Sequence, residues 1–121
     1  MFECIMTIDS KSLYNAVDRI SIMSRDDKDD IIKLMIEKDT LEISSQSKDF
    51  GSAVEQISIE AEVEDGKFEI SVSGKYIKEA ISAIGSEKIV VKFSGELTAF
   101  IIQPSDYHRD IIELILQVRT Y

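Results

Sequence analysis

The stretch FEISVSGKYIKEAISAI, residues 68–84, decides the fold of this chain. Apolar and polar residues alternate up to Ser73, which is the period of a β-strand. From Gly74 onward the apolar residues recur at helical spacing, and Gly85 follows as a helix-ending residue would. The apolar positions are Phe68, Ile70 and Val72 in the strand and Ile77, Ala80, Ile81 and Ile84 in the helix. The stretch therefore predicts a strand that leads directly into a short amphipathic helix.

Residues 4–20 show the same order of strand and helix. When they are aligned with residues 68–84, the apolar positions of both elements coincide, and so does one lysine. Asp9 or Ser10 is expected to cap this first helix. A shared strand, cap, lysine and helical stripe favour an internal duplication over chance. The coinciding residues of the first half are Cys4, Met6, Ile8, Lys11, Leu13, Ala16, Val17 and Ile20.

Three further strands are expected after each of the two helices. They lie at residues 32–36, 41–43 and 54–61 in the first half and at 89–93, 97–102 and 111–119 in the second. The unit is a strand, a helix and three strands, with repeats over approximately residues 1–62 and 63–121. A chain of 121 residues has the usual length of one domain. We therefore expect a single α+β domain, residues 1–121, with two helices against antiparallel sheets.

The composition argues against a free-standing nucleic-acid-binding protein. The chain has 23 acidic and 14 basic residues and a formal net charge of -9, whereas phosphate binding needs a surplus of Lys and Arg. Its single cysteine, Cys4, alternates with apolar residues, so we interpret it as a core residue rather than a reactive thiol. No N-terminal leader pattern is present, and no apolar stretch is long enough to span a bilayer. These features predict a cytoplasmic protein without an internal disulfide.

Three segments resemble the C-terminal, third domain of the bacterial DNA polymerase III beta subunit, a sliding clamp. They are the chain end LILQVRTY (114–121), the strand and helix ISVSGKYIKEAI (70–81) and the segment AVDRISIMS (16–24). The resemblance covers nearly the whole chain and implies a DNA-clamp domain. Family subunits have three such domains, and two subunits close head to tail into a ring around duplex DNA. Because the family's inter-domain linker is missing here, we expect a last domain that is excised or separately encoded.

The resemblance implies a processivity factor without catalytic activity or cofactor. It would tether DNA polymerase III to duplex DNA and dock short peptides from the polymerase catalytic subunit, the clamp loader and other partners. Apolar side chains would anchor the peptide, Tyr76 would form a flat wall, and Arg119 would hold a carbonyl or acidic group. The family usually has Pro at the position of Gln117 and Asn at that of Ser73. The implied pocket consists of Ser73, Tyr76, Leu97, Ala99, Leu114, Leu116, Gln117, Val118 and Arg119.

Without the family, the closing strand is an amphipathic strand whose apolar face would normally join the core. Core packing is the favoured interpretation for Ile112 and Ile115. Leu116 and Val118 lie near the chain end, where we do not expect a compact core to cover them. They favour an apolar groove that could receive a partner peptide.

The resemblance also implies a contact with a second clamp subunit. Ile22 and Met23 resemble the apolar pair that the third domain contributes to it, and an edge strand with Val54 and Ile57 would pair with that subunit. The alternative is that Met23 belongs to the core and that Ile22 is an isolated exposed apolar residue.

Three lysines, Lys11, Lys75 and Lys78, lie on the helices that line the hole of family rings. There they would face DNA phosphates without reading the bases. A solvated helix surface is the favoured alternative, because Asp18 and Glu79 interrupt the basic patch.

Catalysis and metal binding have little support in the sequence. His108, the only histidine, lies in a loop, and no motif places a Ser or Cys nucleophile beside it. A hydrolase is therefore the remotest interpretation. The acidic run at residues 26–30 lacks the glycine and the terminal glutamate of a calcium loop, so no metal site is expected. The alternative to a clamp domain is a small regulatory or ligand-binding α+β domain without catalytic activity.

Overall fold

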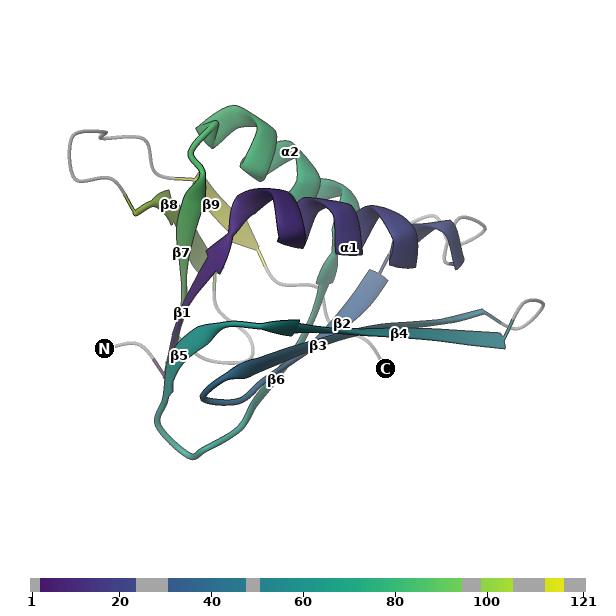
Figure 1. Ribbon diagram of the computed structural model, residues 1–121, viewed down its shortest axis with the longest axis horizontal. Helices are drawn as coiled ribbons and strands as arrows, with labels where there is room; N and C mark the ends of the chain where they lie inside the picture. Colours follow the sequence, from purple (N-terminus) through teal and green to yellow (C-terminus); the bar gives the residue numbers. More distant parts are fainter. Residues whose placement is uncertain (1–2, 24–30, 48–50, 95–98, 106–112, 117–121) are drawn as a thin grey trace.

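Two helices lie side by side against two antiparallel sheets in the computed structural model, which describes residues 3–23, 31–47, 51–94, 99–105 and 113–116 (Figure 1). This arrangement confirms the predicted fold class. In chain order the elements are β1 (Cys4–Asp9), α1 (Ser10–Met23), β2 (Ile31–Ile36), β3 (Thr40–Ser47), β4 (Gly51–Ser58), β5 (Glu60–Val63), β6 (Phe68–Ser73), α2 (Gly74–Ile84), β7 (Lys88–Phe93), β8 (Ala99–Pro104) and β9 (Glu113–Leu116).

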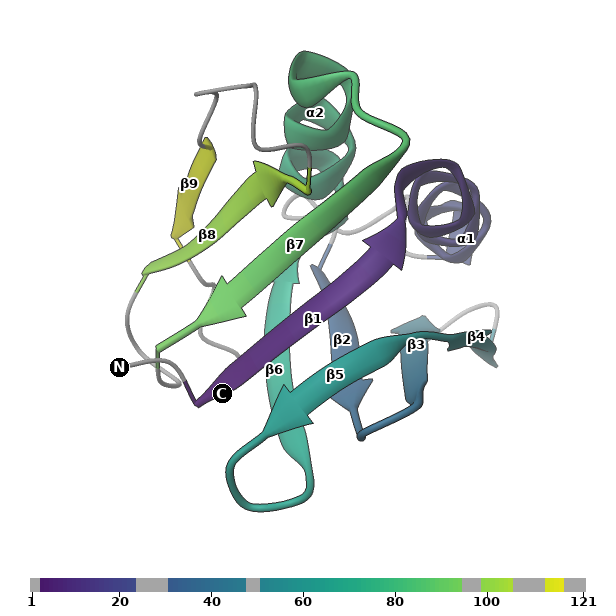
Figure 2. The same cartoon turned by 60° about the vertical axis from the view of Figure 1, so that its left-hand side comes forward.

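Each sheet combines strands from both halves of the chain. One sheet has the order β5-β1-β7-β8-β9, seen side by side in Figure 2, and the other has the order β4-β3-β2-β6. Each helix thus follows a strand of one sheet and precedes strands of the other. The registers correspond as well, since Met6 of β1 pairs with Val91 of β7 and Ile70 of β6 pairs with Leu34 of β2. An origin by duplication, with repeats over residues 1–62 and 63–121, remains our prediction.

The core lies between the sheets and the helices. Every apolar position that the two matched stretches share is buried, from Cys4 to Ile20 and from Phe68 to Ile84. The ring of Phe93 in β7 lies 5.1 Å from that of Phe68 in β6 and 5.0 Å from that of Phe100 in β8. Because β6 and β7 belong to different sheets, this aromatic cluster joins the two sheets.

The predicted helix ends agree with the structure. The Ser12 backbone N–H donates to Oδ2 of Asp9 (3.0 Å), so Asp9 is the capping side chain of α1. The two hydrogen bonds from Ser12 lower the pKa of Asp9, with smaller contributions from nearby lysines. Gly85 adopts the left-handed conformation (φ 67°), and its N–H donates to the Ile81 carbonyl at the end of α2. A residue with a Cβ would be strained at this φ, which explains why the helical pattern ends at a glycine.

One predicted strand is wrong. The stretch 54–61 forms two strands in different sheets, because β4 pairs with β3 whereas β5 pairs with β1. The break falls at Ile59, which is buried and whose N–H donates to the Asp39 carbonyl (3.1 Å). The Ala61 N–H donates to the Lys38 carbonyl (2.9 Å), so the β2–β3 turn contacts the outer edge of β5. Apolar and polar residues alternate through the break, so the pattern could not reveal it.

The closing strands differ from the prediction in their described bounds. The structure describes β8 over Ala99–Pro104, so the strand runs beyond the predicted end at Ile102 to the proline, and residues 97 and 98 lie outside the described residues. It has β9 over Glu113–Leu116, while the rest of the predicted strand 111–119 lies outside the described residues.

Candidate functional site

The start of α2 presents an exposed aromatic ring. Tyr76 lies in the first turn of the helix, and its residue exposure is 52%. Ser73, by contrast, is only 5% exposed, and its Oγ accepts a hydrogen bond from the Tyr76 backbone N–H (3.4 Å). Ser73 is therefore the N-cap of α2, a role that the sequence prediction did not assign to it. Both residues belong to the predicted pocket. Ser73 is buried and caps the helix, whereas Tyr76 is exposed.

The strand pair β8–β9 lies against the same helix, since α2 contacts both strands. In the register of this pair, Leu114 lies opposite Ile101 and Leu116 lies opposite Ala99. The fold thus brings the helix that carries Tyr76 to the strands that carry Ala99, Leu114 and Leu116. The side chains of these last three residues, and all of Leu97, Gln117, Val118 and Arg119, lie outside the described residues.

Ile101 is a neighbour of this site that the sequence prediction missed. It is half-buried, whereas the adjacent Phe100 and Ile102 are fully buried in the core. By the alternation of a strand, Ile101 therefore faces away from the core. A signal was available, because residues 99–102 read Ala-Phe-Ile-Ile and are apolar on both faces. A strand that is apolar on both faces often has both faces covered.

The cap at Ser73 yields a first testable expectation. Ser73→Ala should lower the free energy of unfolding by about 1 kcal/mol, because one N–H of the first turn loses its acceptor in a buried position. Ser73→Asn, which retains a capping oxygen, should cost much less. Urea unfolding followed by circular dichroism measures both changes, and equal losses for the two variants would contradict the capping role.

The predicted subunit surface has both exposed and partly buried members. Ile22 in α1 is 57% exposed, and Val54 in β4, the edge strand of its sheet, is 56% exposed. Ile57 instead packs against the core, which favours a structural role for this residue. Met23 is the last residue of α1, and its side chain lies outside the described residues. The expected exposure thus holds for Ile22 and Val54.

An ion pair that the sequence did not predict ties α1 to this edge strand. Nε of Arg19 donates to Oε2 of Glu55 (2.9 Å), and a terminal nitrogen donates to Oε1 (2.7 Å). These hydrogen bonds raise the pKa of the Arg19 guanidinium. The bidentate geometry holds β4 next to the helix that carries Ile22.

The three predicted DNA-facing lysines have different surroundings. Lys11 and Lys75 are exposed near the starts of α1 and α2. Lys78 is less exposed, and its Nζ lies 3.1 Å from Oδ1 of Asp18, a pair that joins the two helices. Asp18 therefore offsets the charge of Lys78, as the interrupted patch had suggested.

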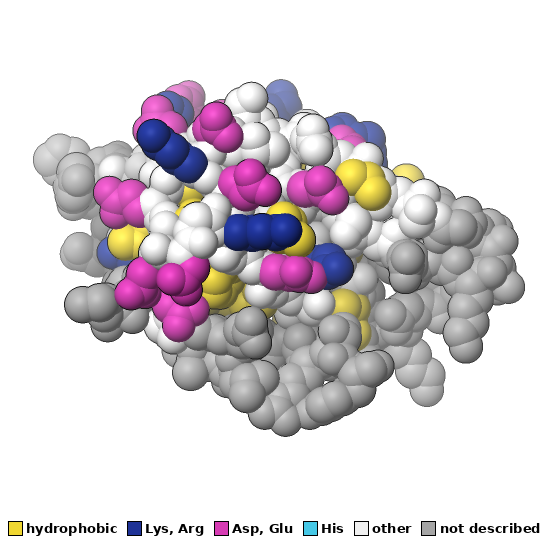
Figure 3. Space-filling model, turned by 90° about the horizontal axis from the view of Figure 1, so that it is seen from below, with side chains coloured by type: hydrophobic (Ala, Val, Ile, Leu, Met, Phe, Trp, Pro, Cys, Tyr) yellow, Lys and Arg dark blue, Asp and Glu magenta, His cyan; other side chains and the backbone are white. Residues whose placement is uncertain are grey.

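The helices nevertheless carry more basic than acidic residues, in contrast to the chain as a whole. They contain four basic and two acidic residues, which leaves 10 of the 14 basic and 21 of the 23 acidic residues for the rest of the chain. Figure 3 shows the side away from the helices, where acidic side chains are spread over the described surface among basic ones. Any phosphate contact by this acidic chain is thus best placed on the helix pair.

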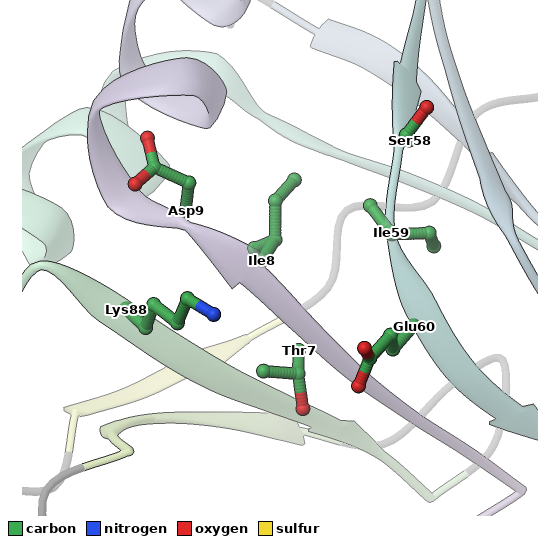
Figure 4. A pocket seen from close by; sticks show the side chains of 7 residues that line it. All are labelled: Thr7, Ile8, Asp9, Ser58, Ile59, Glu60 and Lys88. Carbon is green, nitrogen blue, oxygen red and sulfur yellow. The ribbon is translucent and has the colours of Figure 1, made fainter.

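A pocket of about 300 Å³ lies elsewhere, where β4 passes into β5 (Figure 4). The Lys88 ammonium extends into it, between the Asp9 and Glu60 carboxylates. No predicted site residue lines this pocket. Its lining consists of Thr7, Ile8, Asp9, Ser58, Ile59, Glu60 and Lys88.

Neither a metal cluster nor a membrane helix occurs among the residues that the structure describes. No three His, Cys, Asp or Glu side chains of that part come together as metal ligands. No helix of that part is long and apolar enough to cross a membrane. His108 and the acidic run at residues 26–30 lie outside it.

Comparison with known proteins places the chain in a family. The sequence profile described as DNA polymerase III beta subunit, C-terminal domain, matches residues 1–119. The chain belongs to this family. This finding confirms the resemblance noted in the sequence and does not favour a small regulatory domain as the alternative.

Individual relatives of this clamp domain are several times longer than it. The Staphylococcus aureus Beta sliding clamp is 34% identical over 120 residues, which make up 99% of the chain and 31% of that protein. The DNA polymerase sliding clamp of Bacillus subtilis has a TM-score of 0.89 at 33% identity. The match covers 100% of the chain and 32% of that clamp. The beta subunit of Streptococcus pyogenes DNA polymerase has a TM-score of 0.91 at 26% identity. The match covers 99% of the chain and 32% of that subunit. The clamp domain thus spans about a third of the length of these relatives.

Proposed function

We infer that this clamp domain serves in a replicative sliding clamp, as a non-catalytic module that docks partner peptides. In a full ring it would help to tether DNA polymerase III to duplex DNA in the cytoplasm. Its partners would be the polymerase catalytic subunit, the clamp loader and a second clamp subunit. Duplex DNA would be contacted without sequence preference. The nine pocket residues named from the sequence form the docking site, with Ser73 acting as support for Tyr76.

The exposed ring of Tyr76, on a helix that contacts β8 and β9, carries this proposal. A tyrosine offers a large apolar surface and a hydroxyl, and both suit the capture of a peptide that carries apolar anchors. Tyr76 is 52% exposed in the isolated chain, whereas several phenylalanines of the same chain are buried in the core. Membership of the clamp family gives this exposed ring its functional interpretation.

The subunit and DNA surfaces have separate support. The open edge at β4, with Val54 exposed, is suited to strand pairing with a second subunit. In the helix pair, where Lys11 and Lys75 are exposed, four basic residues stand against two acidic ones. A few phosphate contacts from this pair would hold DNA weakly, as a ring that slides requires.

A peptide of the Gln-Leu-x-Leu-Phe type should bind the chain in a manner that depends on Tyr76. We expect the amide signals of Tyr76, Leu116 and Val118 to shift on titration in NMR spectra. Tyr76→Ala should weaken binding about tenfold, because a central aromatic contact is lost. Tyr76→Phe should retain most of the affinity, since the apolar ring remains. Fluorescence anisotropy with a labelled peptide gives the dissociation constants.

Two controls sharpen this experiment. Ser82→Ala changes an exposed residue of the same helix and should leave the affinity unchanged. A peptide with the same residues in scrambled order should not shift the signals. Absence of any response at millimolar peptide would rule out the docking assignment.

A further inference from the structure

The strand β4 is a sheet edge that lacks most of the features by which proteins protect such edges. Among the described strands it pairs only with β3, and the register of the two runs without a bulge from Gly51 to Ser58. It is eight residues long and contains neither proline nor lysine, whereas the edge strand β5 is four residues long and has two exposed glutamates. Natural edge strands are commonly protected by short length, proline, lysine, a bulge or a charge that points inward. Of these features, only an inward charge is left for β4 itself.

Glu55 is such a charge, and it is the only charged residue of β4. It alternates with the exposed Val54 and lies on the same side of the strand as Ile57, which packs against the core. Its partner in register on β3 is the fully buried Ile43. Arg19 of α1, the helix that contacts β4, holds the carboxylate with bidentate hydrogen bonds. The charge is therefore fixed on the side of the edge that faces the helix.

Pairing of two copies of the chain through β4 would bring two such charges together. A two-fold contact keeps the helix-covered faces of both sheets on one side. Two antiparallel β4 strands that overlap along almost their whole length then have Glu55 opposite Glu55 or Ala53 of the other copy. Opposite residues have Cβ atoms about 4.5–5.5 Å apart, and like charges at this distance destabilise a sheet. The Arg19 side chain, 59% exposed in the isolated chain, would also lose water, which costs free energy unless new partners replace it.

We propose that the Arg19–Glu55 pair determines which strands the β4 edge accepts: it opposes a second copy of this chain and leaves the edge to a strand of different sequence. The proposal rests on the proposed subunit contact at β4. A strand that places a small or basic residue opposite Glu55 avoids the repulsion between carboxylates. The ion pair supplies selectivity at this edge, while the main-chain hydrogen bonds of an added strand supply affinity.

Analytical ultracentrifugation of the 121-residue chain and of double variants tests the proposal. The unmodified chain should be a monomer. The apolar variant, Arg19→Leu with Glu55→Val, should self-associate at least about tenfold more tightly, because both copies lose a charged pair from the contact. Hydrogen exchange should then show protection of the amides of residues 51–58. The reversed variant, Arg19→Glu with Glu55→Arg, keeps an ion pair at the same place and should remain a monomer.

Two further variants control for added apolar surface and for folding. Lys33→Leu with Glu69→Val removes an ion pair between β2 and β6 of the same sheet, whose side chains are 50% and 45% exposed, and should not self-associate. Glu55→Gln removes the charge with almost no change of shape and should raise self-association by a smaller factor than the apolar variant. A cooperative urea transition would show that each variant is folded, and Glu55→Gln decides the question if the apolar variant is not.

Several results would overturn the proposal. They are self-association of the unmodified chain through residues 51–58, association of the reversed variant as tight as that of the apolar one, and monomeric behaviour of every folded variant that lacks the Glu55 charge. Equally tight association of Lys33→Leu with Glu69→Val would attribute the effect to apolar surface in general. In all these cases docking at Tyr76 stands, because the peptide titration measures it separately. If the apolar variant associates without protection of residues 51–58, β4 is not a pairing edge, and the proposed subunit contact fails together with this proposal.

Discussion

Replacing Phe93 with alanine is expected to lower the free energy of unfolding by about 3–5 kcal/mol. The ring is completely buried, at 0% exposure, and it lies between Phe68 and Phe100. Truncation would remove the contact between the two sheets at this point and leave a cavity between rigid strands. Because domains of this size are stable by only about 5–15 kcal/mol, the variant should lose a large fraction of its stability.

Urea unfolding of three variants tests this expectation. Phe93→Leu retains part of the apolar volume and should cost clearly less than the alanine variant. Tyr76→Ala removes an aromatic ring from an exposed site and should change stability by about 0.5 kcal/mol or less. A loss below about 1 kcal/mol for Phe93→Ala would contradict the role of this aromatic cluster in joining the sheets.

Sequence periodicity predicted the helices and strands well, but it did not predict which strands pair with one another. The period of two and the helical stripe identified which residues face the core, because burial depends on local side-chain direction. The change of sheet at Ile59 was not visible, since alternation continues through it and no glycine or proline marks it. Which strand pairs with β4 or β5 depends on contacts between distant residues, and one sequence does not encode these as a local pattern.

The same holds for the candidate site, where local features could be predicted from the sequence and contacts between distant residues could not. The helix that begins at Gly74 followed from apolar spacing, and the choice of Tyr76 as a pocket residue followed from the family resemblance. The capping role of Ser73 could have been predicted, because serine directly before a helix is a common N-cap. The place of Ile101 opposite Leu114 required the β8–β9 register, and the Lys78–Asp18 pair required the contact between two helices far apart in sequence. Such neighbours follow from tertiary structure alone.

The thiol of Cys4 is expected to react with alkylating reagents at least about a thousandfold more slowly in the native chain than in urea. Cys4 is fully buried opposite Phe93, and burial raises the pKa of its thiol to about 12. Reaction therefore requires an opening that exposes the group and allows it to ionise. Since the chain has one cysteine, mass spectrometry of iodoacetamide-treated protein reports this site alone. Phe93→Ala should accelerate labelling about a hundredfold or more, in proportion to its loss of stability.

The raised pKa also makes stability fall at high pH. The unfolded thiol ionises around its ordinary pKa of 9.0, while the native thiol keeps its proton until about pH 12. The contribution of Cys4 is therefore complete below pH 9 and is lost as the pH rises toward 12. At pH 10 this group should lower the free energy of unfolding by about 1.4 kcal/mol relative to neutral pH. Cys4→Ala removes the thiol but leaves every lysine and tyrosine in place, so its stability should decline less between pH 9 and 11. Parallel declines in the two proteins, or labelling of the native thiol as fast as in urea, would show that Cys4 is not part of the closed core.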